Sequence, residues 1–293
     1  MIINGAALAS VFKGFQTLFN QAFEAAKPVW PQLASLVPSS AREEEYGWIG
    51  QIPKLREWIG DRQVMILDAY GYTIRNKKWE STIAVDRDDI EDDRLGIYRP
   101  LIEMMGTEAA MHPDDLVIGL LLAGFSNPCY DGQYFFDADH PGPNGSQSNV
   151  TDAQLSPESY AAARAAIMGY VGDHGRSLNI VPNLLVVGGQ LESMGRKICY
   201  ADQINGTTNE WKGTAELLVL PQILARSWFL LATRLPLKPL IFQQRKKPQF
   251  VALTREDNEA VFMQGKYLYG SDCRDNVGYG FWQMAYGSTG TGA

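Results

Sequence analysis

The chain has 293 residues, a formal net charge of −7, 45% hydrophobic residues and 20% charged residues. A chain of this length buries roughly 75% of its unfolded surface, so it is expected to fold, and its acidic balance argues against a protein that binds nucleic-acid phosphates. No apolar stretch reaches the ~18 residues of a membrane span, and the widely spaced cysteines without a C-x-x-C pair favour reduced thiols in an intracellular protein without a disulfide framework.

The N-terminal segment is predicted to contain an amphipathic helix. Apolar residues in the range 11–23 recur at i, i+3, i+4 spacing and place Phe12, Phe15 and Phe19 on one stripe. Closely spaced prolines from Pro28 onward then favour an extended tether over a packed element. Two interpretations remain open: the helix covers the core of its own chain, or it packs on a neighbouring subunit.

Residues 46–85 are predicted to form a long, charged hairpin. They are rich in aromatic and β-branched residues, and Gly60-Asp61 offers a turn between two extended arms. Pro53 cannot donate to a strand ladder, which favours an edge strand for the first arm. Such a hairpin is expected to project and to need a partner surface, so its candidate subunit-interface residues are Trp48, Arg56, Trp58 and Arg62.

Residues 84–96 (AVDRDDIEDDRLG) are densely acidic. A calcium loop starting at Asp86 fails, because positions 90, 91 and 97 lack the oxygen donor, the turn glycine and the glutamate that the loop requires. The run follows a strand-like segment, so Asp86 is predicted to cap a helix whose first turn holds two more aspartates. Asp92 and Asp93 are candidates for ion pairs across a subunit boundary, and a metal role is a third alternative.

The remaining pattern indicates the α+β class. A long helix is predicted from Pro100 to about Phe125, kinked or restarted at Pro113, and Ser156 is expected to cap a helix through Tyr170. A further helix is predicted over 190–200, and strands at 183–189, 215–221, 227–232, 238–244 and 277–287. Strands and helices do not alternate regularly, which favours α+β over a parallel α/β sheet.

Only one cluster has the residue types of a metal centre. Asp137, Asp139 and His140 lie together in "FFDADHP", with Asp131 nearby. The competing interpretation is a turn in which aspartates cap their own backbone. Nucleotide-binding and hydrolase motifs are absent from the sequence, so we expect no enzyme and no cofactor, with a metal-dependent hydrolase that uses these three residues as the alternative.

The one basic cluster is "QQRKKPQF" at 243–250, which contains Arg245 and Lys246. Few charges without interleaved aromatic residues suit a solvated strand end, or a partner for the acidic run. Both residues are therefore added to the candidate subunit-interface residues.

Five long blocks carry a family resemblance: "YGWIGQIPKLREWIGDR", "WESTIAVDRDDIEDDRLGIY", "CYDGQYFFDADHP", "LKPLIFQQRKKPQF" and "YLYGSDCRDNVGYGFWQMAYG". In this order they resemble the major head subunit, or major capsid protein, of Mu-like bacteriophages and prophages. The resemblance extends essentially from residue 1 to the C-terminal tail.

The resemblance implies the tailed-phage capsid (HK97-like) fold. It assigns residues 1–45 to an N-terminal arm and 46–85 to an extended loop. A peripheral domain with a spine helix would take 86–135 and about 236–260. An axial domain and associated strands would take about 136–235 and 261–286, and 287–293 would form a flexible tail.

The resemblance also implies a function. Such subunits form hexamers and pentamers that close an icosahedral head around double-stranded DNA without reading its sequence. The implied partners are other copies of the chain and the scaffold, maturation protease and portal proteins, and no membrane is involved. The chain would belong to the virion after assembly in the cytoplasm of the bacterial host. An isolated copy would be incomplete, with neighbours covering its hairpin and its phenylalanine stripe.

Overall fold

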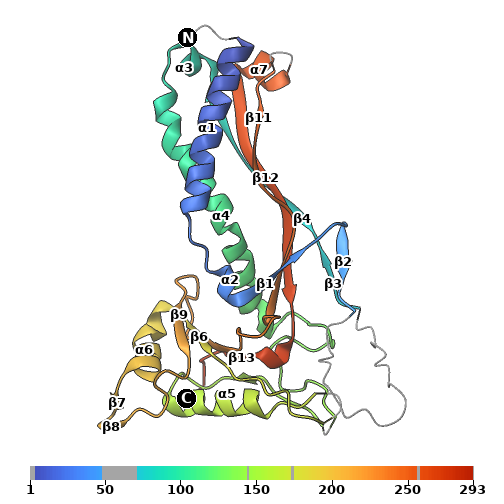
Figure 1. Ribbon diagram of the computed structural model, residues 1–293, viewed down its shortest axis with the longest axis vertical. Coiled ribbons are helices and arrows are strands. Elements are labelled where there is room, and N and C mark those ends of the chain that lie inside the picture. The colour runs from blue at the N-terminus through green and yellow to red at the C-terminus, as the bar shows by residue number, and fades with distance from the viewer. Residues whose placement is uncertain (1–3, 48–70, 144, 173–174, 256–257, 293) are drawn as a thin grey trace.

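The computed structural model describes residues 4–47, 71–143, 145–172, 175–255 and 258–292. The molecule is elongated and consists of two bodies stacked along its long axis (Figure 1). The upper body packs two long helices on a four-stranded sheet, and the lower body combines a five-stranded sheet with shorter helices. The predicted α+β class is confirmed.

The elements have the following bounds. The α-helices are α1 Gly5–Ala25, α2 Trp30–Leu33, α3 Arg87–Glu91, α4 Arg99–Leu122, α5 Pro157–Gly169, α6 Glu192–Tyr200 and α7 Glu259–Gln264. The 3-10 turns are η1 Leu95–Tyr98, η2 Ala123–Phe125, η3 Gly189–Leu191 and η4 Trp282–Met284. The strands are β1 Ala34–Pro38, β2 Glu43–Glu45, β3 Thr73–Arg75, β4 Lys77–Asp86, β5 Val150–Thr151, β6 Leu184–Val187, β7 Gln203–Ile204, β8 Thr207–Thr208, β9 Glu216–Val219, β10 Trp228–Leu231, β11 Leu240–Leu253, β12 Lys266–Tyr279 and β13 Ala285–Ser288.

The upper sheet has the order β1-β11-β12-β4. Its long antiparallel pair, β11 and β12, carries register shifts between Gln244 and Lys246 and between Lys246 and Gln249. Strand β1 runs parallel to β11, and β4 forms the opposite side by pairing with β12. An apolar cluster that includes Val85, Met105 and Tyr267 fills the space between this sheet and the helices.

Helix α1 packs on its own chain. Phe15 and Phe19 are only 4% and 1% exposed, and Phe19 lies 5.3 Å from Phe250 of β11 between ring centroids. Gly106 lets α1 approach α4, because a Cβ there would lie 2.4 Å from the backbone oxygen of Phe19. The hypothesis that neighbouring copies cover the phenylalanine stripe is therefore wrong for Phe15 and Phe19. Phe12 is half-buried and stacks on Phe250 at 5.6 Å.

The proline-rich segment after Pro28 is packed, contrary to the predicted extended tether. It forms α2 and then β1. Leu33, the last residue of α2, is fully buried in the lower apolar cluster. The backbone amides of Val29 and Trp30 donate to the Asp114 carboxylate at 2.9 and 2.6 Å. This long-range cap satisfies the free amides at the start of α2, which the local proline pattern does not indicate.

The predicted spine helix is confirmed as α4, with Pro113 inside it and Pro100 in its first turn. It spans both bodies, because Ile102 and Met105 lie in the upper core while Val117 and Leu121 lie in the lower core. Proline suits the first turn of a helix because an amide there has no intrahelical partner.

The lower sheet has the order β5-β13-β10-β6-β9. All side chains of β6 and β10 are buried, as the apolar runs in the sequence predict. Ser156 caps α5 as predicted, with its Oγ accepting from the amide of Ser159 at 3.1 Å. The predicted helix over 190–200 is present as η3 and α6.

Two C-terminal predictions need correction. The segment 277–287 is not one strand, because the chain leaves the upper sheet at Tyr279, turns through η4 and enters the lower sheet at Ala285. Gly280 permits this bend, since a Cβ there would lie 2.8 Å from the backbone oxygen of Lys238. The tail 287–293 is not flexible over its described part: Ser288 is fully buried in β13, and the amide of Gly292 donates to the backbone oxygen of Asp152 at 2.7 Å.

The structure describes only part of the predicted hairpin. Strands β2 and β3 pair antiparallel at its base. The Gly60-Asp61 turn and Trp48, Arg56, Trp58 and Arg62 lie outside the described residues. The domain boundaries and the interface roles of these four residues stay predictions.

Candidate functional site

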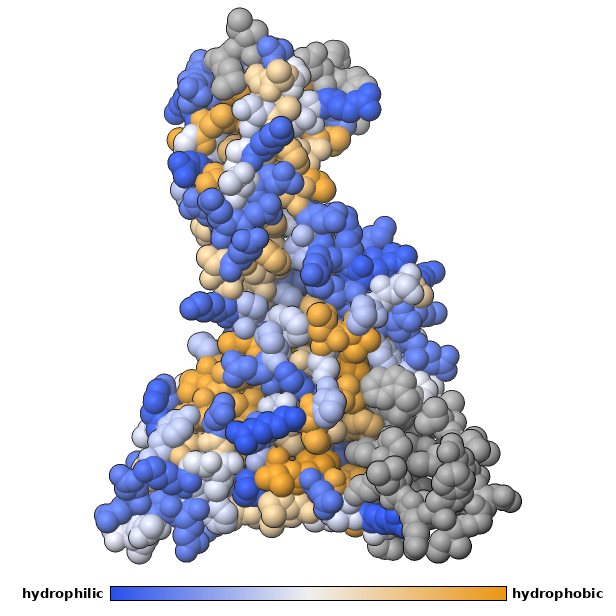
Figure 2. All heavy atoms as spheres, viewed as in Figure 1, coloured by the Kyte–Doolittle hydropathy of each residue, from blue (hydrophilic) through white to orange (hydrophobic). Residues whose placement is uncertain are grey.

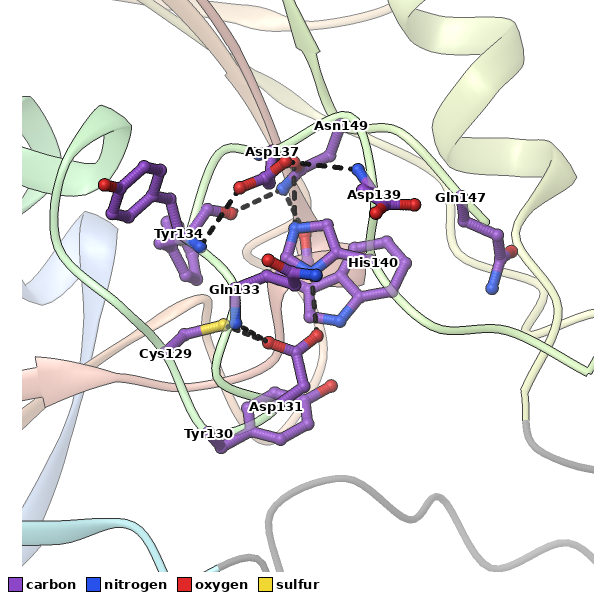
Figure 3. A network of polar contacts seen from close by, with 12 residues as sticks. Cys129, Tyr130, Asp131, Gln133, Tyr134, Asp137, Asp139, His140, Gln147 and Asn149 are labelled. Carbon is purple, nitrogen blue, oxygen red and sulfur yellow. Dashed lines mark hydrogen bonds and ion pairs between the residues drawn. The ribbon is translucent and has the colours of Figure 1, made fainter. Parts of the chain in front are cut away.

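His140 is the centre of a buried polar network in the loop between η2 and β5 (Figure 3). Its Nδ1 lies 2.7 Å from Asp131 Oδ2, and its Nε2 lies 3.2 Å from Asn149 Oδ1. The ring stacks on Trp282 with a centroid distance of 4.0 Å and an interplanar angle of 9°. Two side chains of the same loop therefore hold the ring at its edges, and Trp282 from a distant part of the chain covers one face.

The hydrogen bonds fix the orientation of Asn149 and of the histidine ring. Asn149 Nδ2 donates to the backbone oxygen of Phe135 at 2.8 Å, so its Oδ1 faces His140 as an acceptor. Each ring nitrogen of His140 therefore faces a side-chain oxygen, Nε2 that of Asn149 and Nδ1 that of Asp131. Burial by itself raises the pKa of Asp131, but hydrogen bonds from His140 and Cys129 outweigh it and hold that pKa below its ordinary value.

The neighbouring aspartates are structural caps. Asp137 Oδ1 accepts from the backbone amides of Ala138 and Asp139 at 2.7 and 3.2 Å, and its Oδ2 accepts from the amide of Tyr134 at 3.2 Å. Asp139 Oδ1 accepts from the Ser146 hydroxyl. The predicted alternative of a hydrolase centre is wrong, because His140 is 0% exposed and these carboxylates are used by local backbone and side chains.

Cys129 belongs to the same network and is not a nucleophile. Its Sγ donates to Asp131 Oδ1 at 3.1 Å. Burial, followed by the charge of Asp131, raises the pKa of the thiol far above its ordinary value. Since the reactive form of cysteine is the thiolate, this thiol is inert at neutral pH. The network ties a loop to the lower core.

The acidic run begins α3 as predicted. Asp86 is the N-cap, and its Oδ1 accepts from the amide of Asp88 at 3.1 Å. Asp89 accepts from the hydroxyl of Tyr98 at 2.7 Å. Asp93 ends the helix with a φ of 56°, a left-handed conformation that aspartate tolerates better than most residues.

Asp92 and Asp93 differ from the capping residues. Both are exposed, and among residues 4–47, 71–143, 145–172, 175–255 and 258–292 neither side chain has a hydrogen bond or ion pair. The apolar side chains of Ile97, Leu101 and Met104 follow them in η1 and α4 and are 54%, 48% and 61% exposed. Exposed apolar groups next to unpaired charges are typical of contact surfaces.

The basic cluster lies on β11 and is not a partner of the acidic run within the chain. Lys246 Nζ pairs with Asp272 of β12 at 2.6 Å, and each side chain is about 40% exposed. Arg245 is exposed on the same strand. The backbone amide of Ser40, other donors of that turn and, to a smaller extent, Arg245 hold the pKa of Glu44 below its ordinary value.

The sequence model described as "Mu-like prophage major head subunit gpT" matches residues 8–157, 148–223 and 224–291. The chain belongs to this family. It is 35% identical over 277 residues to the Mu-like prophage FluMu major head subunit of Haemophilus influenzae, covering 94% of this chain and 71% of that protein. It is also 35% identical to the major capsid protein of Escherichia phage Mu over 285 residues, covering 97% and 74% of the two chains.

Comparison with solved structures supports the same assignment. The procapsid of bacteriophage JBD30 is 37% identical with a TM-score of 0.64, covering 98% of this chain and 76% of that chain. A virus-like particle from Pyrococcus furiosus, 11% identical with a TM-score of 0.56 and covering 94% and 98%, shows the shared fold alone. The predicted HK97-like capsid fold and the predicted function of major capsid protein are confirmed.

The major head subunit is thus a virion structural protein whose relatives build capsids. No helix within the described ranges is long and apolar enough to cross a membrane. Sequence reasoning found His140 and Asp131 but missed Asn149 and Trp282, which complete the histidine network. Trp282 is far from His140 in the sequence and gives no local signal, whereas Asn149 is as close as Asp131 but is not a typical metal ligand.

Proposed function

We propose that this major head subunit forms hexamers and pentamers that close an icosahedral head around double-stranded DNA. The family match across residues 8–291 carries the proposal, supported by the structural likeness to the JBD30 procapsid over 98% of the chain. The role is structural rather than catalytic, because His140 of the sequence-predicted catalytic cluster is buried, and Asp137 and Asp139 accept local hydrogen bonds. Closed rings use heterologous contacts without growing into filaments.

The charge of the subunit suits enclosure of DNA without tight binding. Its formal net charge is −7, so a shell built from it repels phosphates rather than condensing them. On the face drawn in Figure 2, hydrophilic residues gather around β2 to β4 and apolar residues gather over the lower body. The subunit therefore offers separate surfaces for polar and apolar contacts.

The family resemblance also suggests partners other than copies of this chain. We propose that assembly takes place in the cytoplasm of the bacterial host with a scaffold protein, a maturation protease and a portal. Each of these proteins contacts the shell or its precursor rather than an isolated subunit, so the test is co-purification with assembled particles.

The surface formed by Asp92, Asp93, Ile97, Leu101 and Met104 is a contact with a second copy of the chain. Its aspartates lack partners and its apolar side chains are half exposed or more. A basic group of a neighbouring copy would pair with the aspartates, and Arg245 is a candidate because it is exposed on β11. An ion pair at a desolvated boundary contributes more than one in open solvent.

The experiment compares assembly with subunit stability. Electron microscopy and mass photometry of the purified chain are expected to show rings or shells. The double variant Asp92→Ala/Asp93→Ala is expected to raise the concentration needed for assembly while leaving the melting temperature of the dilute subunit nearly unchanged. Asp86→Ala is the matched control, because loss of an N-cap lowers subunit stability by about 0.5–2 kcal/mol.

Two results would contradict the proposal. A chain that remains monomeric at high concentration and under all assembly conditions would exclude a shell-forming subunit. Equal losses of assembly and of subunit stability in the double variant would limit the two aspartates to a role within α3.

A further inference from the structure

The interface between α4 and the upper sheet changes character at its middle. The upper apolar cluster ends near Met105 and Tyr269, and the lower cluster begins at Val117. Between them, the buried groups of β12 are polar or sulfur-containing: Ser271, Cys273 and Asp275. Buried polar groups inside an otherwise apolar interface are costly unless they are hydrogen-bonded, paired or bound to a metal.

Three metal-binding side chains converge in this gap. His112 comes from α4, and Cys273 and Asp275 come from one face of β12, because alternate residues of a strand point the same way. Their ligand atoms all lie within 4.8 Å of one another. His112 Nε2 is 3.3 Å from Asp275 Oδ1. Positions 163 residues apart thus supply nitrogen, sulfur and oxygen to one point.

One atom at this point has no partner. Asp275 is 1% exposed, and its Oδ2 is buried without a hydrogen bond to any residue that the structure describes. A buried carboxylate oxygen is normally satisfied, and an orphan of this kind is most simply explained by a cation or a water. The carboxylate of Asp275 therefore lies close to the thiol of Cys273 and the imidazole of His112.

A cavity of about 190 Å³ gives access to the point. His112 and Cys273 line it, together with the acidic side chains of Glu80, Glu108 and Asp115. Glu108 and Asp115 lie on the same face of α4 as His112, at i−4 and i+3. The carboxylates attract a cation to the cavity and stand ready, directly or through a water, to complete its coordination.

We propose that His112, Cys273 and Asp275 form a site for one divalent cation of the zinc type. Mixed nitrogen, sulfur and oxygen ligands select zinc or cobalt over magnesium and calcium, which prefer oxygen alone. The thiolate and the carboxylate together balance the two charges of the ion. A tetrahedral ion takes three protein ligands and a fourth from the cavity.

Binding releases a proton. Burial, and then the neighbouring Asp275 carboxylate, raises the pKa of the Cys273 thiol to about 12, so the thiol is protonated at neutral pH. On binding, Sγ loses this proton to solvent and forms the metal–sulfur bond.

A second group, Cys129, Asp131 and His140, has the same residue types but a different hydrogen-bonding pattern. Both oxygens of Asp131 already accept hydrogen bonds, from Cys129 and Gln133 on one side and from His140 on the other. Both carboxylate oxygens of the second group are therefore satisfied, whereas Asp275 Oδ2 in the gap has no hydrogen bond among the described residues. The second group therefore serves as an internal control.

The site has a structural consequence beyond the shell-forming role. An ion held between α4 and β12 clamps the spine helix to the sheet at the junction of the two bodies. Because the unfolded chain does not hold the ligands together, the binding free energy adds to the stability of the fold.

The test is titration of the full-length chain, stripped with EDTA, with Co²⁺ as a spectroscopic probe and Zn²⁺ as a competitor. The wild-type chain is expected to bind one Co²⁺ with a sulfur-to-cobalt charge-transfer band, which Zn²⁺ abolishes. Cys273→Ser, a near-isosteric change, is expected to lose the band and to weaken binding by more than about 100-fold, since loss of even an outer contact costs 10–100-fold. Cys129→Ser is expected to retain both.

Thermal melts give an independent readout. Zn²⁺ is expected to raise the melting temperature of the wild-type and Cys129→Ser chains, and to leave Asp275→Asn unchanged. A wild-type chain without a charge-transfer band would overturn the proposal even if every variant misfolded. So would a band that survives Cys273→Ser or disappears in Cys129→Ser.

Discussion

Replacing Phe19 with alanine tests whether α1 belongs to the core of its own chain. The ring is 1% exposed and lies 6.2 Å from Phe23 and 5.3 Å from Phe250, measured between centroids. Its loss removes packing between α1 and β11 and leaves a cavity that the rigid sheet cannot close. The effect should therefore be found in a single, unassembled subunit.

The expected loss is about 3–5 kcal/mol, the usual range for a buried phenylalanine replaced by alanine. At about 2–4 °C per kcal/mol, the melting temperature of the upper body falls by roughly 6–20 °C. The assay is thermal unfolding of the dilute subunit, with mass photometry to verify that no assembly is present. Hydrogen exchange should show faster exchange of α1 amides in the variant.

Phe12→Ala on the same helix is the control. Phe12 is half-buried and also stacks on Phe250, so its replacement should cost only roughly 1–2 kcal/mol. If Phe19→Ala left the melting temperature of the dilute subunit within about 1 °C of the wild type and still blocked assembly, the reasoning would be refuted. The helix would then depend on a neighbouring copy for its packing.

Three further outcomes follow from the structure. Gly106→Ala should strongly destabilise the subunit in thermal melts, because the new Cβ would lie 2.4 Å from the backbone oxygen of Phe19, and an unchanged melting temperature would disprove this contact. Asp131→Asn should lower the stability of the subunit at neutral pH and reduce the further loss of stability in acid. The lowered pKa of Asp131 gives stability that is present above about pH 4 and is lost as the pH falls through the folded-state value. Parallel profiles of stability against pH for variant and wild type would contradict the pair with His140. Ser156→Ala should cost about 1 kcal/mol by removing the cap of α5, as chemical denaturation can measure, whereas Ser156→Asp should cost little.

The long elements were predictable because their signals are local. Pro100 in a first turn, Ser156 before a proline and the apolar runs of β6 and β10 each report on a few neighbouring residues. Asp86 as a helix cap is of the same kind. In each case the residue and the group that it satisfies are close in sequence.

The errors concern partners that are distant in sequence. The amphipathic stripe of α1 shows that a face is covered, but not that α4 and β11 of the same chain cover it. The proline-rich segment folds because Asp114 caps it from 84 residues away. The glycine-rich tail is ordered because β13 pairs with β10 and because Gly290, with a φ of 65°, fits tightly against the backbone of Arg226.

The functional interpretation divides in the same way. Asp137 caps nearby backbone amides and Asp139 accepts from the Ser146 hydroxyl, so a local structural role for both was within reach of the sequence. The convergence of His112 with Cys273 and Asp275 was not, since it depends on how α4 crosses β12. Cluster searches along a sequence find neighbours in the chain, whereas binding sites are made of neighbours in space.

The ribbon of β11 and β12 and the helix α4 run side by side through both bodies. Two continuous elements therefore connect the two bodies, so we expect a force applied at one end of the subunit to reach the other end through packed structure. The ladder is irregular between Gln244 and Gln249, and we expect bending to be easiest there. In an assembled shell, the subunits would then deform most readily at this level of the sheet.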